Sequence, residues 1–239
     1  MDPNFHTANR TENRLLASLP PGELARLWPA LEPVPLKHRQ SVYDPGAPFR
    51  HAYFPEQGLI SVVAMMDDGD SIEVGTIGAE GMTGLPVLSD GTSPYRHFVQ
   101  IEGRALRMAA ARLREETQHD TPLRRLLLRY QTAFATQLMQ SVACNGLHNV
   151  QERCARWLLR CIDHTSSSEV FITHEFLAQM LGVRRASISD VLRPLQTSGV
   201  IRSRRGVVSV IDRPGLEGQA CECNRVINVE YDRLMRGAL

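Results

Sequence analysis

Two hydrophobic periods divide the chain into a strand-rich part and a helical part. From about residue 34 to residue 108, short runs of alternating apolar and polar residues are separated by glycine, proline and aspartate, the pattern of antiparallel strands. From residue 109 onward, apolar residues recur every three or four positions, the pattern of helices. The sequence therefore predicts an α+β chain with four segments: 1–33, 34–108, 109–145 and 146–239.

The strand-rich segment contains several hairpin candidates. Asp-Gly at residues 68–69 favours a tight turn, so Leu59–Met66 is expected to pair with Ser71–Ile77. The other predicted strands are Ser41–Tyr43, His51–Phe54, and a final pair, Tyr95–Ile101 and Arg104–Met108, which turns at Glu102 and Gly103. Before them, residues up to about Thr11 resemble a loose tail, and a helix from Glu12 is expected to stop at Pro20 and Pro21 and to resume through Leu31.

The segment 109–145 predicts one long helix with a restart at Asp120, which can cap the turn that contains Pro122. Its apolar positions form a stripe with three- and four-residue steps: Leu123, Leu127, Tyr130, Phe134, Leu138 and Val142. So long a helix has more apolar surface than one small domain needs, so we expect part of the stripe, within 123–142, to form a homodimer. Asn145 and Gly146 are expected to interrupt the helix.

Residues 171–212 predict a winged helix-turn-helix. Thr173 is a good N-cap for a first helix that Gly182 ends. A second helix then buries four apolar residues, Ile188, Val191, Leu192 and Leu195. Strands at 199–202 and 207–211 follow and enclose the basic turn Ser203–Gly206. Pro194 is expected to bend the second helix, and a short helix through Val226 and Leu234 is expected to end the chain.

The charge of this segment indicates DNA binding. Arginine at the start of a helix opposes the positive end of the helix dipole, and an external polyanion would reverse that unfavourable interaction. Phosphate contacts supply affinity, and arginine pairs bidentately with guanine. The candidate DNA-binding residues are Thr173, Arg184, Arg185, Ser187, Asp190, Arg193, Arg204 and Arg205.

The run ITHEFLAQMLGVRRASISDVLRPLQTSGVI resembles the DNA-binding end of the cyclic-AMP receptor protein and fumarate-nitrate regulator (Crp/Fnr) family of bacterial transcription factors. In that family the second helix usually opens Ser-Arg-Glu-Thr-Val, with another arginine shortly after. Arg185 keeps the base-reading arginine, whereas Arg184, Ala186, Ser187 and Asp190 stand in place of the serine, the glutamate, the threonine and the second arginine.

The resemblance implies a cyclic-nucleotide-binding-like β-roll as a sensor, a dimerisation helix and a winged helix-turn-helix that binds a palindromic site, with RNA polymerase as a further partner. We expect Arg185 to contact a base, with Arg184 and Asp190 sharing specificity, and Thr173, Ser187, Arg204 and Arg205 to contact phosphates. Asp190 either accepts from a cytosine amino group or holds Arg185 or Arg193, and the sequence leaves both open.

The stretch GTIGAEGMTGLPVLSDGTSPYR lies where the family places its cyclic-nucleotide phosphate cassette. Its recurring glycines permit close backbone approach to a phosphate, and the ligand-binding candidates are Gly78, Glu80, Gly81 and Arg96. The cassette is degenerate, because His97 and Phe98 follow Arg96 where the family has Ser or Thr and then Ala. Cyclic AMP is therefore not expected, and both another small effector and a purely structural loop remain open.

The composition bears on the source of nucleic-acid affinity, on the cellular compartment and on the state of the cysteines. The net charge of +1 over 239 residues means that nucleic-acid affinity must come from local clustering. No apolar run is long enough to span a membrane, and the N-terminus lacks the apolar core of a signal peptide, which predicts a cytoplasmic protein. The five cysteines are then expected to be reduced.

The cysteines are candidate metal ligands. Iron-sulfur members of the resembled family use several N-terminal cysteines, and none precedes Cys144 here, so no iron-sulfur cluster is expected. Cys144 with His148 and Cys161 with His164 have spacings that a metal can use, but Cys221 and Cys223 have a poor zinc-knuckle spacing. The spacings favour no metal and incidental thiols, and they leave a redox role for Cys221 and Cys223 open.

No enzyme is predicted, because the chain lacks G-x-S-x-G, H-E-x-x-H and Walker-loop patterns. The favoured function is a sequence-specific transcription regulator. Two alternatives remain: an effector-binding module that regulates through protein contacts, and a redox- or metal-responsive regulator that uses its cysteines.

Overall fold

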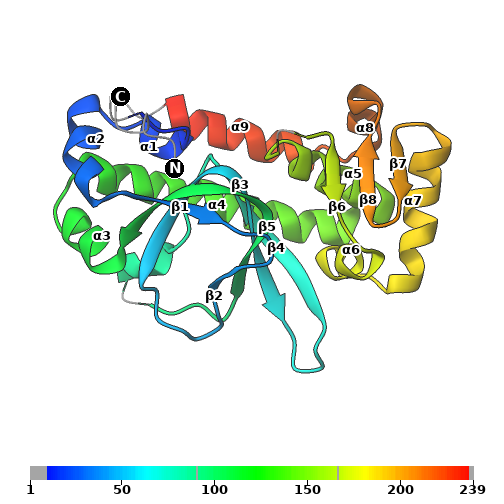
Figure 1. Cartoon of the computed structure of the whole chain (residues 1–239), viewed down its shortest axis with the longest axis horizontal. Helices are drawn as coiled ribbons and strands as arrows, with labels where there is room; N and C mark the ends of the chain where they lie inside the picture. Colours follow the sequence, from blue (N-terminus) through cyan, green and yellow to red (C-terminus); the bar gives the residue numbers. More distant parts are fainter. Residues whose placement is uncertain (1–9, 90, 166, 237–239) are drawn as a thin grey trace. The chain divides into compact units, whose positions relative to one another are not determined.

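The computed structural model describes residues 10–89, 91–165 and 167–236 (Figure 1). The order of elements is mainly strands followed by helices, so the predicted α+β class is confirmed. Most of the predicted N-terminal tail, residues 1–9, lies outside the described residues. The described chain opens with three short turns of helix: α1 (Arg14–Ala17), α2 (Pro21–Leu27) and the 3-10 turn η1 (Trp28–Ala30).

A five-stranded antiparallel sheet follows. Its strands are β1 (Glu32–Leu36), β2 (Ser41–Tyr43), β3 (His51–Met65), β4 (Ser71–Ile77) and β5 (Arg96–Ala109), and the 3-10 turn η2 (Leu85–Ser89) lies between β4 and β5. The order is β1-β5-β3-β4, and β2 also pairs with β5. The predicted β3–β4 hairpin across residues 67–70 is confirmed.

Two predicted interruptions in this sheet are wrong. The strands predicted at 51–54 and 59–66 form the single strand β3, and the pair predicted to turn at Glu102 and Gly103 is the single strand β5. The glycines in these two strands do not form turns; they allow the backbones of β3 and β5 to approach closely. A Cβ atom on Gly58 would collide with the carbonyl oxygen of Ile101, and one on Gly103 with that of Gln57, so side chains are excluded where the two backbones meet.

Three helices come next: α3 (Ala110–Thr117), α4 (Pro122–Leu147) and α5 (Val150–Ile162). Two predicted signals were misplaced. Thr121, not Asp120, caps the start of α4, because its hydroxyl accepts from the backbone N–H of Arg124 at 3.1 Å. The helix also continues through Asn145 and Gly146. The break follows Leu147, where Asn149 caps α5 through a reciprocal capping box with Glu152.

The C-terminal part alternates short strands and helices. Its elements are β6 (Glu169–Phe171), α6 (His174–Leu181), the 3-10 turn η3 (Arg185–Ser187), α7 (Ile188–Thr197), β7 (Ile201–Arg204), β8 (Val207–Val210), α8 (Arg213–Gln219) and α9 (Cys223–Arg236). The strands form a small antiparallel sheet in the order β6-β8-β7. The predicted terminal helix is confirmed as α9, and α8 was not foreseen.

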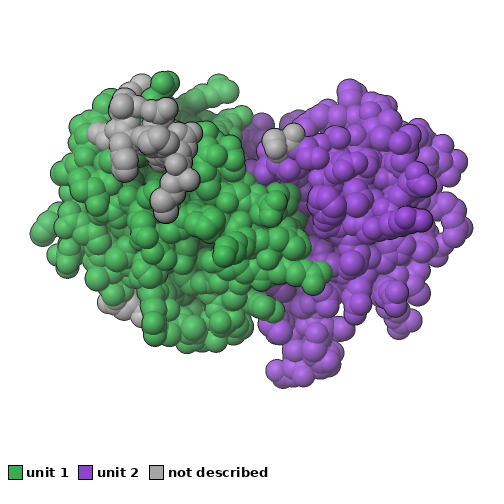
Figure 2. Space-filling view, in the orientation of Figure 1, with its two compact units in different colours: residues 1–60, 77–135, 230–239 green, residues 61–76, 136–229 purple. Residues whose placement is uncertain are grey.

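The chain folds into two compact units (Figure 2). Unit 1 comprises residues 1–60, 77–135 and 230–239, and unit 2 comprises residues 61–76 and 136–229. Each has buried apolar residues, among them Phe54, Leu106 and Leu127 in unit 1 and Leu158, Ile188 and Leu195 in unit 2. The segment boundaries predicted at 33, 108 and 145 stay predictions. Within the described ranges, no helix is both long and apolar enough to cross a membrane.

Candidate nucleic-acid interface

The two ends of helix α6 are fixed by capping residues that can be recognised in the sequence. The hydroxyl of Thr173 accepts from the backbone N–H of Phe176 at 3.1 Å, which satisfies one of the free donors at the helix start. Leu177 and Leu181 are buried, and Gly182 ends the helix in the left-handed conformation with φ of 62°. The predicted cap and stop are both confirmed.

The second helix starts later than predicted. Arg184 has an extended backbone, Arg185 to Ser187 form the 3-10 turn η3, and α7 begins at Ile188. The N–H of Ser187 bonds to the carbonyl of Arg184 at 2.9 Å, the shorter repeat of a 3-10 turn. The helix continues through Pro194 to Thr197.

Helix α7 is amphipathic: one face is buried in the domain, and the opposite face is free to enter a DNA groove. Its apolar face is buried, as predicted for Ile188, Val191, Leu192 and Leu195. The opposite side, together with η3, is exposed and carries most of the predicted DNA-binding residues: Arg184, Arg185, Asp190 and Arg193, with Ser187 partly exposed.

Asp190 has a partner within its own helix. Its carboxylate lies 3.2 Å from the guanidinium of Arg193, and both side chains are about three-quarters exposed. Of the two partners considered from the sequence, the structure therefore pairs Asp190 with Arg193. An exposed pair of this kind adds little stability, so both groups can exchange this contact for one with DNA.

The wing is a tight hairpin with a basic tip. Strands β7 and β8 are joined by Arg205 and Gly206, whose φ angles are both positive, 47° and 79°. Two such residues are the mark of the type I′ turn that fits the twist of a hairpin. The turn leaves Arg204 and Arg205 exposed.

One residue that the sequence did not single out ties the wing to α7. The side-chain oxygen of Gln196 accepts from the backbone N–H of Ser203 at 3.1 Å. No local pattern distinguishes a glutamine with this role from one that faces solvent, because its partner lies in the following strand.

The predicted ligand-binding residues of the glycine-rich stretch are largely engaged within unit 1. Glu80 is buried, and its carboxylate accepts from the N–H of Gly78 at 3.1 Å. A Cβ atom on Gly81 would collide with the side chain of Tyr130 in α4, and the hydroxyl of Tyr130 donates to the carbonyl of Met82 at 2.9 Å. Arg96 is exposed, and its guanidinium carbon lies 6.0 Å from the ring centroid of Phe98.

His97, which departs from the family cassette, is part of a buried aromatic cluster. Its ring lies 5.1 Å from that of Tyr43 and 6.3 Å from that of Phe49, measured between centroids. All three side chains are buried. Loss of water around the imidazole lowers the pKa of His97 to about 4, so the ring is neutral at physiological pH.

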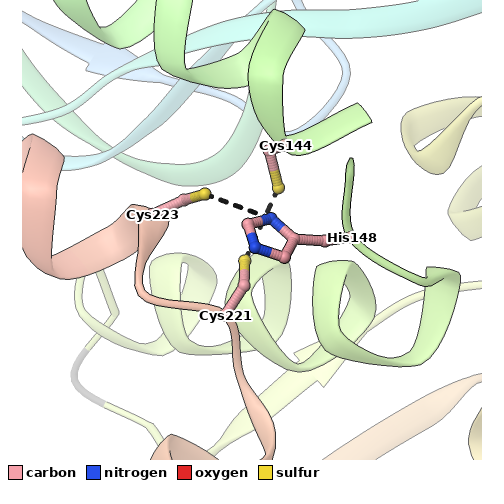
Figure 3. A group of neighbouring side chains, drawn as sticks. All are labelled: Cys144, His148, Cys221 and Cys223. Atoms are coloured by element: carbon pink, nitrogen blue, oxygen red, sulfur yellow. Dashed lines mark hydrogen bonds between the residues drawn. The ribbon is translucent and has the colours of Figure 1, made fainter. Parts of the chain in front are cut away.

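All five cysteines are buried, and three of them meet one histidine in unit 2 (Figure 3). Cys144, His148, Cys221 and Cys223 place their sulfur and nitrogen atoms within 4.8 Å of one another. A hydrogen bond between the sulfurs of Cys144 and Cys221 lowers the pKa of Cys144 to about 4 and raises that of Cys221. Sequence spacing had marked Cys144 with His148 as usable by a metal and Cys221 with Cys223 as poorly spaced, and it gave no sign that the two pairs meet.

Comparison with known proteins agrees with this geometry. Residues 152–218 match the model of the Crp-like helix-turn-helix domain. The transcriptional regulator LdrP of Thermus thermophilus is 27% identical over 196 residues, which cover 76% of this chain and 93% of that protein.

Two solved structures share the fold. A protein of Eubacterium rectale assigned to the Crp/Fnr family aligns with a TM-score of 0.69 at 17% identity and covers 86% of this chain and 96% of its own. A Crp/Fnr-family transcriptional regulator of Thermus thermophilus aligns with a TM-score of 0.66 at 20% identity and covers 79% of this chain and 98% of its own.

A winged helix-turn-helix that matches the Crp-like domain model defines a DNA-binding domain of the kind found in transcription regulators. Residues 152–218 carry a Crp-like helix-turn-helix domain, and the chain resembles Crp/Fnr-family proteins in its fold, as the sequence of the α6–α7 region predicted.

Proposed function

We propose that the protein acts as a homodimer that binds a palindromic DNA site and regulates transcription without catalysis. The observation that carries this proposal is the exposed basic surface of η3, α7 and the wing, backed by a buried apolar face. In the proposed complex Arg185 contacts a base, Arg184 and Asp190 share specificity, and Thr173, Ser187, Arg204 and Arg205 contact phosphates.

The exposed face of α4 supports dimerisation, but it shares only Val142 with the stripe that the sequence indicated. Leu123, Leu127 and Tyr130 of that stripe are buried within the chain, so they cannot face a partner. A second line of residues at alternating steps of four and three is largely exposed instead: Leu128, Thr132, Ala135, Met139 and Val142. This spacing is that of a coiled-coil seam, and we call it the α4 seam.

The apolar members of the α4 seam are unusually exposed for a folded chain. Leu128 is 49% exposed, Met139 65% and Val142 74%. A second copy of the same helix offers a matching apolar and small-residue face, and a two-fold axis would then present two α7 helices to successive turns of the DNA groove.

The proposed sensor is a β-roll whose cyclic-nucleotide cassette is degenerate, so that cyclic AMP is not its effector. Two features support this. Bulky His97 and Phe98 follow Arg96, and Gly81 is needed for contact with Tyr130. An effector of another class remains compatible with the roll, and RNA polymerase remains the proposed partner on DNA.

One experiment tests the proposed function as a whole. The purified, ligand-free chain is used to select sequences from a pool of random duplex DNA. We expect enrichment of a two-fold symmetric motif with half-sites about one helical turn apart. An absence of enrichment at low ionic strength, with candidate effectors supplied, would overturn the proposal, and enrichment of a single unrepeated half-site would overturn the dimer.

A further inference from the structure

The group formed by Cys144, His148, Cys221 and Cys223 has the composition of a metal site. We call it the Cys3His cluster. Three thiols and one imidazole make up one of the standard ligand sets of structural zinc. The three sulfurs belong to buried residues and the imidazole to a partly buried one, and the two pairs of ligands come from distant parts of the sequence.

The distances within the cluster match one metal ion. With zinc–sulfur bonds of about 2.3 Å, the sulfurs of a tetrahedral site lie roughly 3.8 Å apart. The sulfurs of Cys144 and Cys221 are 3.5 Å apart, the sulfur of Cys223 is 3.5 Å from Nδ1 of His148, and every pair of ligand atoms lies within 4.8 Å. Cysteines that hold a multi-iron cluster stand farther apart, because the irons lie between them.

The histidine is oriented as a metal ligand. Its Nδ1 faces the sulfurs, while its Nε2 lies 3.3 Å from the carboxylate of Glu222. A ligating histidine usually donates its other ring N–H to a carboxylate or carbonyl, which fixes the tautomer and the ring. Glu222, the residue between the two cysteines of the Cys-Glu-Cys run, supplies that partner.

Groups around the cluster can stabilise negative charge on the sulfurs. The side-chain amide of Gln140 donates to the sulfur of Cys223 at 3.1 Å. Arg156 and Arg153 of α5 both act electrostatically on Cys144. Three thiolates around Zn²⁺ leave one net negative charge, which these cations offset.

We propose that Cys144, His148, Cys221 and Cys223 bind one Zn²⁺ ion per chain in a closed tetrahedral site. Four protein ligands leave no open position, so the site is structural and not catalytic. Cys144 lies in the last turn of α4, His148 between α4 and α5, Cys221 between α8 and α9, and Cys223 at the first position of α9. An ion held by these four side chains, which Figure 3 shows gathered together, would fasten the C-terminal end of α4 to the segment that follows the wing.

The test is made on the full chain purified without chelator. We expect about one zinc per chain by elemental analysis. Replacement by Co²⁺ should give the visible absorption of a tetrahedral site and sulfur-to-cobalt charge-transfer bands. The double variant Cys221→Ser/Cys223→Ser should lose both signals. The control Cys154→Ala, which alters a buried cysteine of the same unit outside the cluster, should keep them.

A second variant guards against simple misfolding of the first. Glu222→Gln keeps all four ligands and changes only the carboxylate behind His148, and its affinity for Zn²⁺ should fall about 10- to 100-fold while its circular dichroism stays unchanged. Protein that contains no zinc, gives no tetrahedral cobalt spectrum and has a Cys144–Cys221 disulfide or five equally reactive thiols would overturn the proposal.

The zinc measurement needs no DNA, so the two proposals fail separately. Zinc at one per chain in a protein that ignores DNA overturns only the proposed function. Selective DNA binding by a protein that takes up no Zn²⁺ or Co²⁺ overturns only the metal site.

Discussion

The arginines of the DNA-binding surface are chemically alike but are placed for different contacts. Arg185 lies in the turn that leads into α7, whereas Arg205 lies at the tip of the wing. We predict that Arg185→Ala costs about 1 to 3 kcal/mol of binding and relaxes preference at one base pair, whereas Arg205→Ala weakens binding to all sequences alike. Fluorescence anisotropy with the selected site and its single-base variants measures both effects.

Two controls separate contact from folding in that experiment. Arg205→Lys keeps the charge at the left-handed position and should bind almost normally. Arg125→Ala removes an exposed arginine of α4 that pairs with Asp120 and should leave DNA binding unchanged. Equal weakening of every duplex by both Arg185→Ala and Arg205→Ala would contradict the assigned roles.

His97 gives a residue-level prediction of pH dependence. Its pKa is lowered from 6.5 to about 4 in the folded chain, so the unfolded chain binds the extra proton between those values. Stability therefore falls as pH drops from about 6.5 through 4, by about 3 kcal/mol for this one group. Denaturant unfolding at several pH values measures the effect. The variant His97→Gln should lose this part of the pH dependence, and an unchanged profile would show that His97 is not its source.

How far single residues could be predicted depended on whether their partners are near in sequence. Thr173 and Gly182 were placed correctly because a helix cap bonds to residues within three or four positions of it in the sequence. The role of Gln196 and the meeting of Cys144 with Cys221 were missed, since their partners lie 7 and 77 residues away. The spacing of residues in the sequence does not predict contacts between such distant side chains.

At the scale of elements, the α4 seam makes dimerisation testable. A carboxylate at Val142 would face its copy across a two-fold axis, and an uncompensated buried charge costs about 3 to 5 kcal/mol. We predict that Val142→Glu raises the dimer dissociation constant at least about 100-fold, as measured by analytical ultracentrifugation.

A matched substitution tests whether the effect is specific to the α4 seam. Val229 of α9 is also an exposed valine, at 57% against 74% for Val142, and it lies outside the seam. Val229→Glu should leave the dimer intact. Dimers of undiminished affinity in Val142→Glu, or monomers in both variants, would count against the seam as the interface.

The elements also show why turns and strands were harder to predict than helix ends. Glycine predicted a turn at Gly103, yet β5 runs straight through it because β3 passes too close for a side chain. The same residue type at Gly69 does lie in a turn, with φ of 90°. Only the presence of a neighbouring strand distinguishes the two glycines. That neighbour belongs to the tertiary structure, so the local sequence does not predict it.

At the scale of the whole molecule, a net charge of +1 means that affinity for DNA depends on a few local contacts. The salt dependence of binding therefore reports the number of those contacts, because each phosphate contact adds about 0.9 to the slope of log K against log salt concentration.

In a homodimer the substitution Arg205→Ala removes one phosphate contact from each protomer. The slope should then fall by about 1.8, whereas a monomer on a single half-site would lose about 0.9. Titrations between low and moderate salt therefore report the phosphate role of Arg205 and the number of chains on the duplex together. An unchanged slope would remove Arg205 from the phosphate contacts, and a fall of half the expected size would argue for one bound chain.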